Sequence, residues 1–596
     1  MIRPAAQPRA AAWGSALIWL ICAVALIVIG RYYIETINFR DPDDALRLVE
    51  VRNWMAGQSW FDVTQYRSHP PTGAPMHWSR LVDVPIAAFI TIFGLFAAPE
   101  MAERLAMVVV PLAMLGGLMA TLHALTVRIT GRPLAGVVAA VMLATSVGVL
   151  VQFQPMRIDH HGWQITLTLL AIWFVIARSG DPVRNAMLAG LVMAVSLTVA
   201  LESLPLAVAL GGVLALRYLR GTENFAGLLG YVVALGAGAG LLLPVMLGWS
   251  GAMVPWCDAM SPAYVLPVLT VALVLVLARR FVPQQHVWQR LTCLAVAGGV
   301  GALLLSLATP QCLRGPFSTL DPLVYKLWYL SINEGMPVWV QSIDLRIIVP
   351  LPGVLGLIGT LLAIRFDVRE RRERWIELLI VQGVAFAVSM MVMRAMGLAH
   401  VLAMPGNAWL FLAALGAAMR LSTPVGRVLA GFACFALMPL GADVIGLAVL
   451  EGQAAPQPKG QEKKPEGSWD ICVTRRGFEQ LNAIPATTIL TPLDIGSHML
   501  AFTHHDVVAT GHHRNVEGMK TVISALTADP DKARSIVLRS GARYVGLCAS
   551  ENESRRYATL FPHSLTAALA QDRPPAWLRR VPMQRADDIR FYKVID

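Results

Sequence analysis

The sequence predicts a polytopic α-helical membrane protein that carries a small α/β domain at its C-terminal end. Of its 596 residues, 56% are hydrophobic and only 15% are charged, a composition typical of chains with many membrane spans. Arginines gather in the short turns between apolar runs on one side, which is the positive-inside pattern. The net charge of +11 therefore indicates membrane orientation and not nucleic-acid binding, since the sequence contains no basic domain interleaved with aromatic residues.

About thirteen apolar stretches are expected to span the membrane. The first, residues 13–30, is expected to be an uncleaved helix and not a removed signal. The others are expected at about residues 103–126, 133–152, 163–178, 185–200, 203–218, 225–248, 262–279, 291–308, 348–365, 376–394, 397–419 and 426–449. An odd number of spans places the C-terminus on the outer side, opposite the arginine-rich turns.

The chain is predicted to divide into a membrane domain and a soluble domain. The membrane domain, residues 1–450, carries two large outer loops, 31–102 and 309–347. Residues 451–468 are rich in Pro, Gly, Lys and Glu and read as a linker. Residues 469–596 are expected to form the soluble α/β domain. We expect a multi-pass protein of the bacterial inner membrane whose C-terminal domain lies in the periplasm.

Local patterns predict several elements outside the spans. Apolar spacing from Asp43 to Met55 predicts an amphipathic surface helix, with Asp41 as its N-cap and Pro42 at its first position. Residues 86–98 are expected to form a helix on the outer surface. Strands of the soluble domain are predicted at 488–490, 535–538, 543–547 and 590–594.

The soluble domain contains two cysteines, Cys472 and Cys548. A disulfide between them is permitted in an oxidising compartment. Two unpaired buried thiols are an equal alternative, because a sequence does not give the separation of their Cα atoms.

Three consecutive titratable residues, Asp159, His160 and His161, lie between the apolar runs 133–151 and 165–177. Charge at the mouth of two membrane segments is costly and is usually functional. A carboxylate beside an imidazole suits Mn²⁺ or Mg²⁺ better than a soft metal. The alternative is that Asp159 only caps the following helix.

Three further polar motifs are predicted to share the outer face with this stretch. They are DPDDALR at 41–47, SINEGMPVW at 331–339, and Arg394, which stands alone in apolar sequence at the outer end of a span. Each has a simpler interpretation: a helix cap for the first, a solvated loop carboxylate for Glu334, and an arginine that reaches the interface for Arg394.

Together the motifs resemble the catalytic subunit of oligosaccharyltransferases, which belongs to the GT-C class of polyprenyl-dependent membrane glycosyltransferases. Asp41, Pro42 and Arg47 match the spacing of the acidic motif in that family's first outer loop. Asp159 and His161 fit the Asp-x-His motif that archaeal members carry in the second outer loop.

The two remaining motifs extend the resemblance along the whole chain. Ser331, Ile332 and Glu334 match a Ser/Thr-Val/Ile-x-Glu motif in a mobile outer loop near span nine. Arg394, followed by an apolar run that ends in Pro405, matches an arginine motif of the family. The resemblance implies a GT-C-like fold and a lipid-linked sugar donor.

The resemblance also implies roles for individual residues. The implied ligands of one divalent cation, Mg²⁺ or Mn²⁺, are Asp41, Asp159, His161 and Glu334. Catalytic carboxylates are expected among Asp41, Asp43 and Glu334, of which Asp41 or Asp43 orients or deprotonates the acceptor. Arg394 and Arg157 are expected to bind phosphate.

The sequence departs from the family where the acceptor is recognised. The family's soluble domain opens with Trp-Trp-Asp-Tyr-Gly, which reads the hydroxyl residue of an Asn-x-Ser/Thr acceptor. The corresponding stretch here is TPLDIGSHML, in which Asp494 and Gly496 are kept but Pro492 and Leu493 replace the paired Trp. We expect an acceptor region that contains Asp494, His512 and His513; structural or surface histidines are the simpler alternative for the last two.

The first interpretation is a metal-dependent inverting glycosyltransferase that takes a polyprenyl-linked donor and modifies a glycolipid or cell-envelope glycan. Neither GxGxxG in a βαβ context nor GxxxxGK[ST] is present, which favours a lipid-linked donor over a nucleotide sugar. One alternative is an oligosaccharyltransferase acting on protein. Another is a metal-independent member of the class that uses Asp41 or Asp43 as base without His161. A third is a transporter or assembly scaffold, although the inverted repeats of transporters are not seen.

Overall fold

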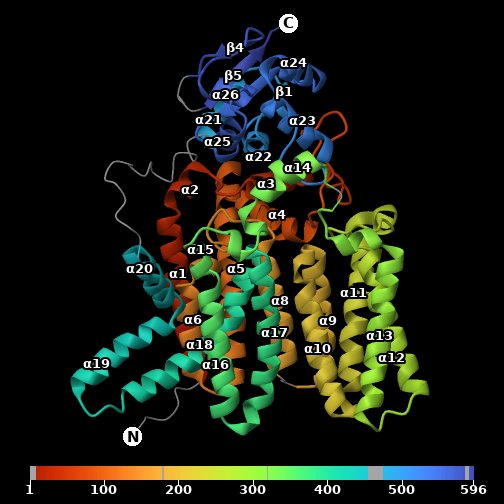
Figure 1. Cartoon of the computed structure of the whole chain (residues 1–596), viewed down its shortest axis with the longest axis vertical. Helices are drawn as coiled ribbons and strands as arrows, with labels where there is room; N and C mark the ends of the chain where they lie inside the picture. The colour runs from red at the N-terminus through yellow and green to blue at the C-terminus, as the bar shows by residue number, and fades with distance from the viewer. Residues whose placement is uncertain (1–7, 178–179, 319, 454–473, 584–588, 596) are drawn as a thin grey trace.

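The computed structural model describes residues 8–177, 180–318, 320–453, 474–583 and 589–595. A bundle of long helices forms the larger part of the protein, and a region with all five strands caps one end of it (Figure 1). Short helices of the outer loops, α3, α4 and α14, lie between the bundle and this cap (Figure 1). The polytopic α-helical fold class is confirmed.

Ten helices of the described residues are long and apolar enough to cross a membrane. They are α1 (Pro8–Ile29), α5 (Pro99–Thr130), α9 (Pro182–Val199), α10 (Leu204–Arg220), α11 (Phe225–Ala252), α12 (Pro262–Phe281), α13 (Val287–Ala308), α16 (Pro350–Phe366), α17 (Arg372–Met391) and α18 (Met396–Ala418). Two shorter apolar helices, α6 (Pro133–Ala144) and α8 (His161–Ala177), occupy two more predicted spans. The total of thirteen spans remains a prediction.

Two of the predicted spans are broken. In the stretch 133–152, α6 ends at Ala144 and a short helix, α7 (Val147–Leu150), follows. The break falls at Thr145, whose hydroxyl donates to the carbonyl of Val141 at 3.0 Å and so competes with the helical hydrogen bonds.

The last predicted span, 426–449, is two helices, α19 (Pro424–Ala433) and α20 (Pro439–Gln453), in a pair bent by 89°. Pro439 has no N–H to continue a helix, and it forces Met438 into an extended conformation with ψ 146°. Both corrections arise from local backbone chemistry that a hydropathy window does not detect.

The arginine-rich turns meet at the end of the bundle opposite the cap. Arg374 donates to the backbone carbonyl of Arg128 at 3.0 Å, and Arg217 forms an ion pair with Glu377 at 2.7 Å. These contacts join the ends of α5, α10 and α17, so the turns that the positive-inside rule assigns to one side do lie together.

We predict that this end is cytoplasmic and that the soluble cap is outside. Single cysteines introduced as Glu370→Cys, in the turn before α17, and as Glu517→Cys, on an exposed part of the cap, test the orientation. A membrane-impermeant maleimide added to intact spheroplasts should label position 517 and leave position 370 unlabelled until the cells are lysed. Labelling of position 370 alone would reverse the orientation.

The cap is built on a five-stranded sheet of order β2-β1-β3-β5-β4. Its strands are β1 (Thr488–Leu490), β2 (Asp506–Val507), β3 (Tyr544–Cys548), β4 (Leu578–Val581) and β5 (Ile589–Val594). β1 pairs in parallel with β2 and β3, whereas β5 runs antiparallel to β3 and β4. The helices of this region are α21 (Arg475–Glu479), α22 (Leu493–Phe502), α23 (Val516–Thr527), α24 (Pro530–Arg539), α25 (Asn552–Leu560) and α26 (Leu565–Ala570). The proposed domain boundaries at 450 and 469 remain predictions.

One predicted strand of this region, 535–538, is wrong because these residues belong to α24. Asp529 caps the helix by accepting from the backbone N–H of Asp531 at 3.1 Å, and Pro530 fills the first helical position. Ala533 and Val537, four residues apart, are the buried pair. This helical spacing outweighs the β-propensity of a short apolar run.

The first outer loop forms the platform on which the cap rests. The predicted amphipathic helix is α3 (Pro42–Met55), which packs against both α4 (Arg80–Gly94) and α22. Arg52 of α3 donates to the carbonyl of Ala501 at 2.6 Å, and Arg67 donates to that of Leu500 at 3.0 Å. The surface helix predicted at 86–98 is α4, which starts earlier because Ser79 caps it.

The loop 309–347, the second of the two large outer loops and called the second outer loop from here on, is folded into short helices. The longest is α14 (Pro322–Leu327), whose Val324 and Leu327 are buried in the core of the cap. A disulfide joins Cys257 to Cys312 with their Cα atoms 4.9 Å apart; the sequence analysis missed this pair, although both cysteines lie in predicted outer loops. Cys472 lies outside the described residues, so its pairing with Cys548 stays a prediction.

Candidate functional site

The N-terminus of α3 places the first acidic motif. Asp41 is the N-cap: one carboxylate oxygen accepts from the backbone N–H of Asp43 at 2.9 Å. Its other oxygen lies 2.5 Å from Nη1 of Arg157. The helix cap and the site residue are therefore the same side chain, and the two interpretations of this motif do not exclude each other.

Asp44, on the same helical turn, holds the loop of the second acidic motif. Its Oδ1 accepts from the backbone N–H groups of Ile158 at 2.8 Å and Asp159 at 3.0 Å, and its Oδ2 pairs with Arg157 at 2.9 Å. Burial raises the pKa of Asp44 to about 7, although Arg157 opposes the shift. The first outer loop thus fixes the backbone on which Asp159 stands.

Asp159 is at the centre of a buried charge cluster. His160 Nδ1 lies 2.6 Å from its Oδ1, and Arg47 Nη2 lies 3.6 Å from the same oxygen. Burial would raise the pKa of Asp159, but the His160 and His161 imidazoles and Arg157 lower it well below its usual range. Its Oδ2 is buried without a hydrogen-bond partner among the described residues and lies 3.5 Å from Nε2 of His161.

Arg47 is fully buried and links three carboxylates. Its Nη1 lies 3.1 Å from Asp83 and 3.2 Å from Glu50, and its guanidinium stacks over the ring of Trp78 at 4.3 Å. Together with the contact to Asp159, these interactions place one positive charge among three carboxylates, and Arg80 adds a second at 3.1 Å from Asp83. Arg47 of the DPDDALR motif therefore has a structural role: it holds the carboxylates beneath the site in place.

We predict that Arg47→Met lowers the free energy of unfolding by about 3–5 kcal/mol, because breaking a buried ion network leaves uncompensated charge. Thermal unfolding of the purified protein in detergent is the measurement. The matched control is Arg31→Met, which removes an exposed pair with Glu35 and should leave the unfolding transition as in the wild type, because exposed ion pairs add little stability. Equal shifts for the two variants would contradict the role assigned to Arg47.

Arg394 lies opposite the acidic loops, in a turn that immediately precedes α18. Its Nη1 is 3.0 Å from Glu202 and 3.8 Å from Glu334, and its Nε is buried without a hydrogen-bond partner among the described residues. The backbone N–H of Met393 donates to the carbonyl of Met336 at 3.2 Å, which ties this turn to the second outer loop. The structure thereby brings the third and fourth motifs together.

Glu202 is a site residue that the sequence analysis missed. It bonds Arg394, and its other carboxylate oxygen lies 3.7 Å from Nδ1 of His161. The signal was present in the sequence, since Glu202 is a lone acidic residue between two apolar runs, the same pattern that singled out Arg394.

These motifs border one outer cavity of about 610 Å³. It lies where the membrane helices, both outer loops and the cap meet. The polar side chains around it are Arg40, Asp41, Asp43, His77, His160, Thr198, Glu202, Asp258, Ser331, Asn333, Glu334, Arg394, Asp494, His512, His513, Asn552, Glu553 and Arg556. Burial, followed by the charges of Asp41, Asp159 and Glu334, raises the pKa of Asp43 well above its usual range. The carboxyl groups are therefore close enough to repel one another, and a cation bound among them would reduce this repulsion.

The predicted residues occupy two positions relative to this cavity. Asp41, Asp43, Glu334 and Arg394 line it directly. Asp159 is buried and reaches the cavity through its contact with His160, and His161 borders a small hollow that is also lined by Glu202 and Arg394. Arg157 is bound to two carboxylates, so its role as a phosphate ligand remains a prediction.

The donor atoms fit a divalent cation. The unpartnered Oδ2 of Asp159 faces an imidazole nitrogen of His161, and Asp159, His160 and His161 each offer a ligand atom within 4.8 Å of the others. This group is one carboxylate with two imidazoles, and it does not include Asp41 or Glu334, the other two predicted ligands. A carboxylate beside an imidazole suits Mn²⁺ or Mg²⁺ better than a soft metal. This chemistry supports the predicted cation site without fixing the identity of the ion.

The predicted acceptor region lies on the cap side of the cavity. Pro492 is the N-cap of α22 and Leu493 is fully buried, so neither presents a donor to the cavity. Burial and the charge of Glu551 raise the pKa of Asp494 to about 7. His512 and His513 line the cavity beside it, whereas His504 and His505 bond to backbone carbonyls of their own domain.

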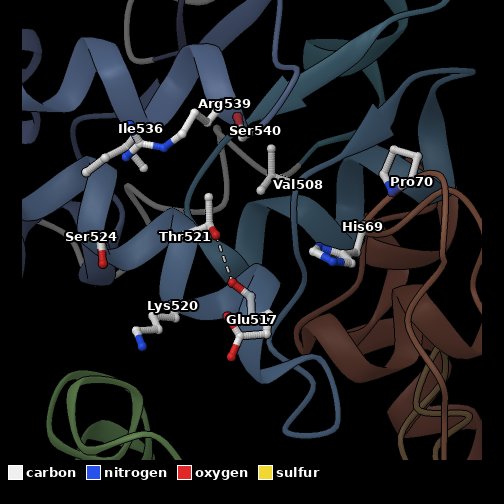
Figure 2. Close-up of a pocket in the computed structure, with 10 residues that line it drawn as sticks. All are labelled: His69, Pro70, Val508, Glu517, Lys520, Thr521, Ser524, Ile536, Arg539 and Ser540. Atoms are coloured by element: carbon white, nitrogen blue, oxygen red, sulfur yellow. Dashed lines mark hydrogen bonds between the residues drawn. The ribbon is translucent and has the colours of Figure 1, made fainter.

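A second cavity, of about 450 Å³, lies between the first outer loop and the cap (Figure 2). His69 and Pro70 line one side, and residues of α23 and α24, among them Glu517 and Lys520, line the other. None of the four sequence motifs contributes to it, so it is not assigned to the same site.

The sequence profile described as "Oligosaccharyl transferase STT3, N-terminal" matches residues 48–205, which include the Asp159 motif but less than half of the chain. A comparison with curated protein sequences gives no significant match.

Solved structures resemble nearly the whole chain. The archaeal oligosaccharyltransferase AglB from Archaeoglobus fulgidus, in complex with an inhibitory peptide and a dolichol-phosphate, gives a TM-score of 0.65 at 14% identity. The alignment covers 95% of this chain and 72% of that one.

The chain has a GT-C fold. Two further structures of the Archaeoglobus fulgidus oligosaccharyltransferase support this. One is tethered to an acceptor peptide with the NVT sequon; it gives a TM-score of 0.64 at 14% identity, over 93% of this chain and 72% of that one. The other is a complex with Zn and sulfate, with a TM-score of 0.58 at 15% identity, over 93% and 70%. At these identities the likeness establishes the GT-C fold alone. With the partial profile match, it supports a membrane glycosyltransferase.

Proposed function

We propose that the protein is a metal-dependent glycosyltransferase that moves a sugar or oligosaccharide from a polyprenyl-(pyro)phosphate to a glycolipid or cell-envelope glycan. The observation that carries the proposal is one cavity lined by residues of all four sequence motifs: Asp41 and Asp43 from the first, His160 from the second, and Glu334 and Arg394 from the other two. A cation, an arginine and a carboxylate are what displacement of a phosphate-linked sugar requires.

Each side chain has a defined part in the transfer. Arg394 binds the departing phosphate, for which its unpartnered Nε is an available donor. Asp43 orients the acceptor hydroxyl and takes its proton as the new glycosidic bond forms and the sugar–phosphate bond breaks. Asp41, Asp159, His161 and Glu334 would hold a divalent cation, which would supply positive charge to stabilise the departing phosphate.

The acceptor assignment rests on the cap. In the oligosaccharyltransferase family, indole N–H groups recognise the sequon hydroxyl by hydrogen bonding. The side chains of Pro492 and Leu493 donate no hydrogen bond. Loss of such donors weakens selection for a hydroxyl residue by several kcal/mol. Asp494 and the imidazoles beside it accept hydrogen bonds from sugar hydroxyls, which favours a glycan or glycolipid.

One observation favours a second candidate, transfer to the Asn of a protein sequon. Trp328, from the second outer loop, lines the cavity, and its Nε1 lies near Gly511: a Cβ atom added to that glycine would be 3.3 Å from Nε1 and 3.4 Å from Asp494. An indole N–H therefore reaches the acceptor region from another part of the chain.

The experiment offers the purified protein and a lipid-linked sugar pool two acceptors in parallel, a fluorescent Asn-x-Thr peptide and an envelope glycolipid extract. The proposal expects transfer to the glycolipid that stops with EDTA and returns with Mn²⁺ or Mg²⁺, and no glycopeptide. Efficient peptide glycosylation that Trp328→Phe abolishes would establish the second candidate instead. Transfer that continues unchanged in EDTA would contradict the metal requirement.

A further inference from the structure

We infer that His77, His512 and His513 form a second metal site, separate from the carboxylate site, that binds a first-row transition ion such as Zn²⁺. His77 comes from the first outer loop, and His512 and His513 come from the cap. The inference does not rest on the transfer reaction proposed above, but it assigns His512 and His513 to a metal and leaves Asp494 as the contact for the acceptor.

The three rings already have the spacing of a metal site. Each offers a nitrogen, and the three nitrogens lie within 4.8 Å of one another. Nδ1 of His77 and Nε2 of His512 are only 2.9 Å apart. In a tetrahedral zinc site with Zn–N bonds of about 2.0–2.1 Å, ligand nitrogens are about 3.3 Å apart. Small side-chain rotations are therefore enough to bring all three nitrogens onto one ion.

His513 has the supporting contact that metal-bound histidines usually have. Its Nε2 lies 2.7 Å from Oδ2 of Asp258, and Arg514 holds both oxygens of that carboxylate, with Nε at 2.7 Å and Nη2 at 2.8 Å. A carboxylate on one ring nitrogen fixes the proton there and leaves the lone pair of Nδ1 for a metal. The Cys257–Cys312 disulfide fixes the segment that carries Asp258.

The hydrogen bonds of the cluster do not satisfy all of its polar atoms. His512 is 4% exposed, and its Nδ1 is buried without a hydrogen-bond partner among the described residues. Burial lowers the pKa of His512 and of His77 well below their usual range.

The ligand type distinguishes this site from the carboxylate site. Three imidazoles select Zn²⁺, Cu²⁺ or Ni²⁺, whereas Mg²⁺ prefers oxygen ligands. Three histidines and one water complete a four-coordinate shell. A bound ion would join the first outer loop to the cap at the rim of the cavity and so hold the cap over the carboxylates.

The test uses the full chain, purified without a histidine tag, stripped with a chelator and kept in excess Mg²⁺ so that the oxygen-rich site is saturated. Co²⁺ is then titrated while the visible d–d bands of a four-coordinate ion are recorded. We expect one Co²⁺ per chain and at least a tenfold loss of affinity in His512→Ala and in His77→Asn. Asp258→Asn removes the carboxylate from His513 and also weakens its pair with Arg514; it should weaken binding about 10- to 100-fold.

Two controls separate this site from its neighbours. His504→Ala removes an exposed histidine of the cap that bonds the carbonyl of Ile484 and should leave the titration unchanged. Asp159→Asn alters the carboxylate site and should also leave it unchanged. Zn²⁺ should raise the unfolding temperature of the stripped wild type but not of His77→Asn, a readout that remains if His512→Ala does not fold. Absence of d–d bands in excess Mg²⁺, or bands lost in Asp159→Asn and kept in both histidine variants, would overturn the inference.

Discussion

Asp159→Asn is expected to lower the transfer rate about 10³-fold while the protein stays folded and monodisperse in detergent. Asp159 carries an unpartnered buried oxygen 3.5 Å from His161, and the amide nitrogen of Asn neither carries charge nor binds a hard cation. Loss of one charge-stabilising group at a phosphoryl leaving group typically costs 10²- to 10³-fold or more.

The measurement is initial rate against Mn²⁺ concentration with a polyprenyl-linked donor. The role assigned to Asp159 predicts that the residual activity of the variant requires more Mn²⁺. Asp531→Asn is the matched control, because Asp531 is an exposed carboxylate of the first turn of α24; it should behave as wild type. An Asp159→Asn protein with normal rate and normal Mn²⁺ dependence would remove Asp159 from the cation site.

Arg394→Leu is expected to lower the rate by about 10²- to 10³-fold through a different step, binding of the departing phosphate. The side chain meets Glu202 at 3.0 Å and Glu334 at 3.8 Å, so it stands between two carboxylates and the cavity. Arg394→Lys keeps the charge but loses the planar, bidentate geometry and should restore only part of the activity.

The affinity for a lipid phosphate distinguishes the role of Arg394 from that of Asp159. Affinity for undecaprenyl phosphate should fall in Arg394→Leu and change little in Asp159→Asn when no divalent cation is added. The control is Arg314→Leu, which removes the same positive charge from an exposed position of the second outer loop and should leave the affinity unchanged. Normal phosphate affinity in Arg394→Leu would place the phosphate elsewhere, and Arg157 would be the next candidate.

Much of the architecture could be predicted because it follows from hydropathy. Long apolar runs and arginine-rich turns predicted the bundle, and the Asp-Pro pair at 41–42 predicted the start of α3. The breaks at Thr145 and Pro439 and the helical state of 535–538 depend on individual hydrogen bonds and capping groups, which a window average does not resolve.

For the site, sequence order identified the four motifs but not their geometry. It did not predict that Arg157 is held by Asp41 and Asp44, since that contact joins residues more than a hundred positions apart. Glu202 was not predicted, although a lone acidic residue between two apolar runs is visible in the sequence. The partner of His512, His77, comes from a separate loop, so the histidine cluster has no local signature.

The packing of α3 against α22 has a consequence for how the protein matures. α3 is synthesised early and α22 some 440 residues later, yet Arg52 of the first completes its hydrogen bonds on the carbonyl of Ala501 in the second. In a nascent chain, α3 therefore lacks this contact until the last segment of the protein has been made and has folded. For the function proposed above, we expect transfer activity to appear only at this last step of biogenesis, so that a truncated product inserts into the membrane without it.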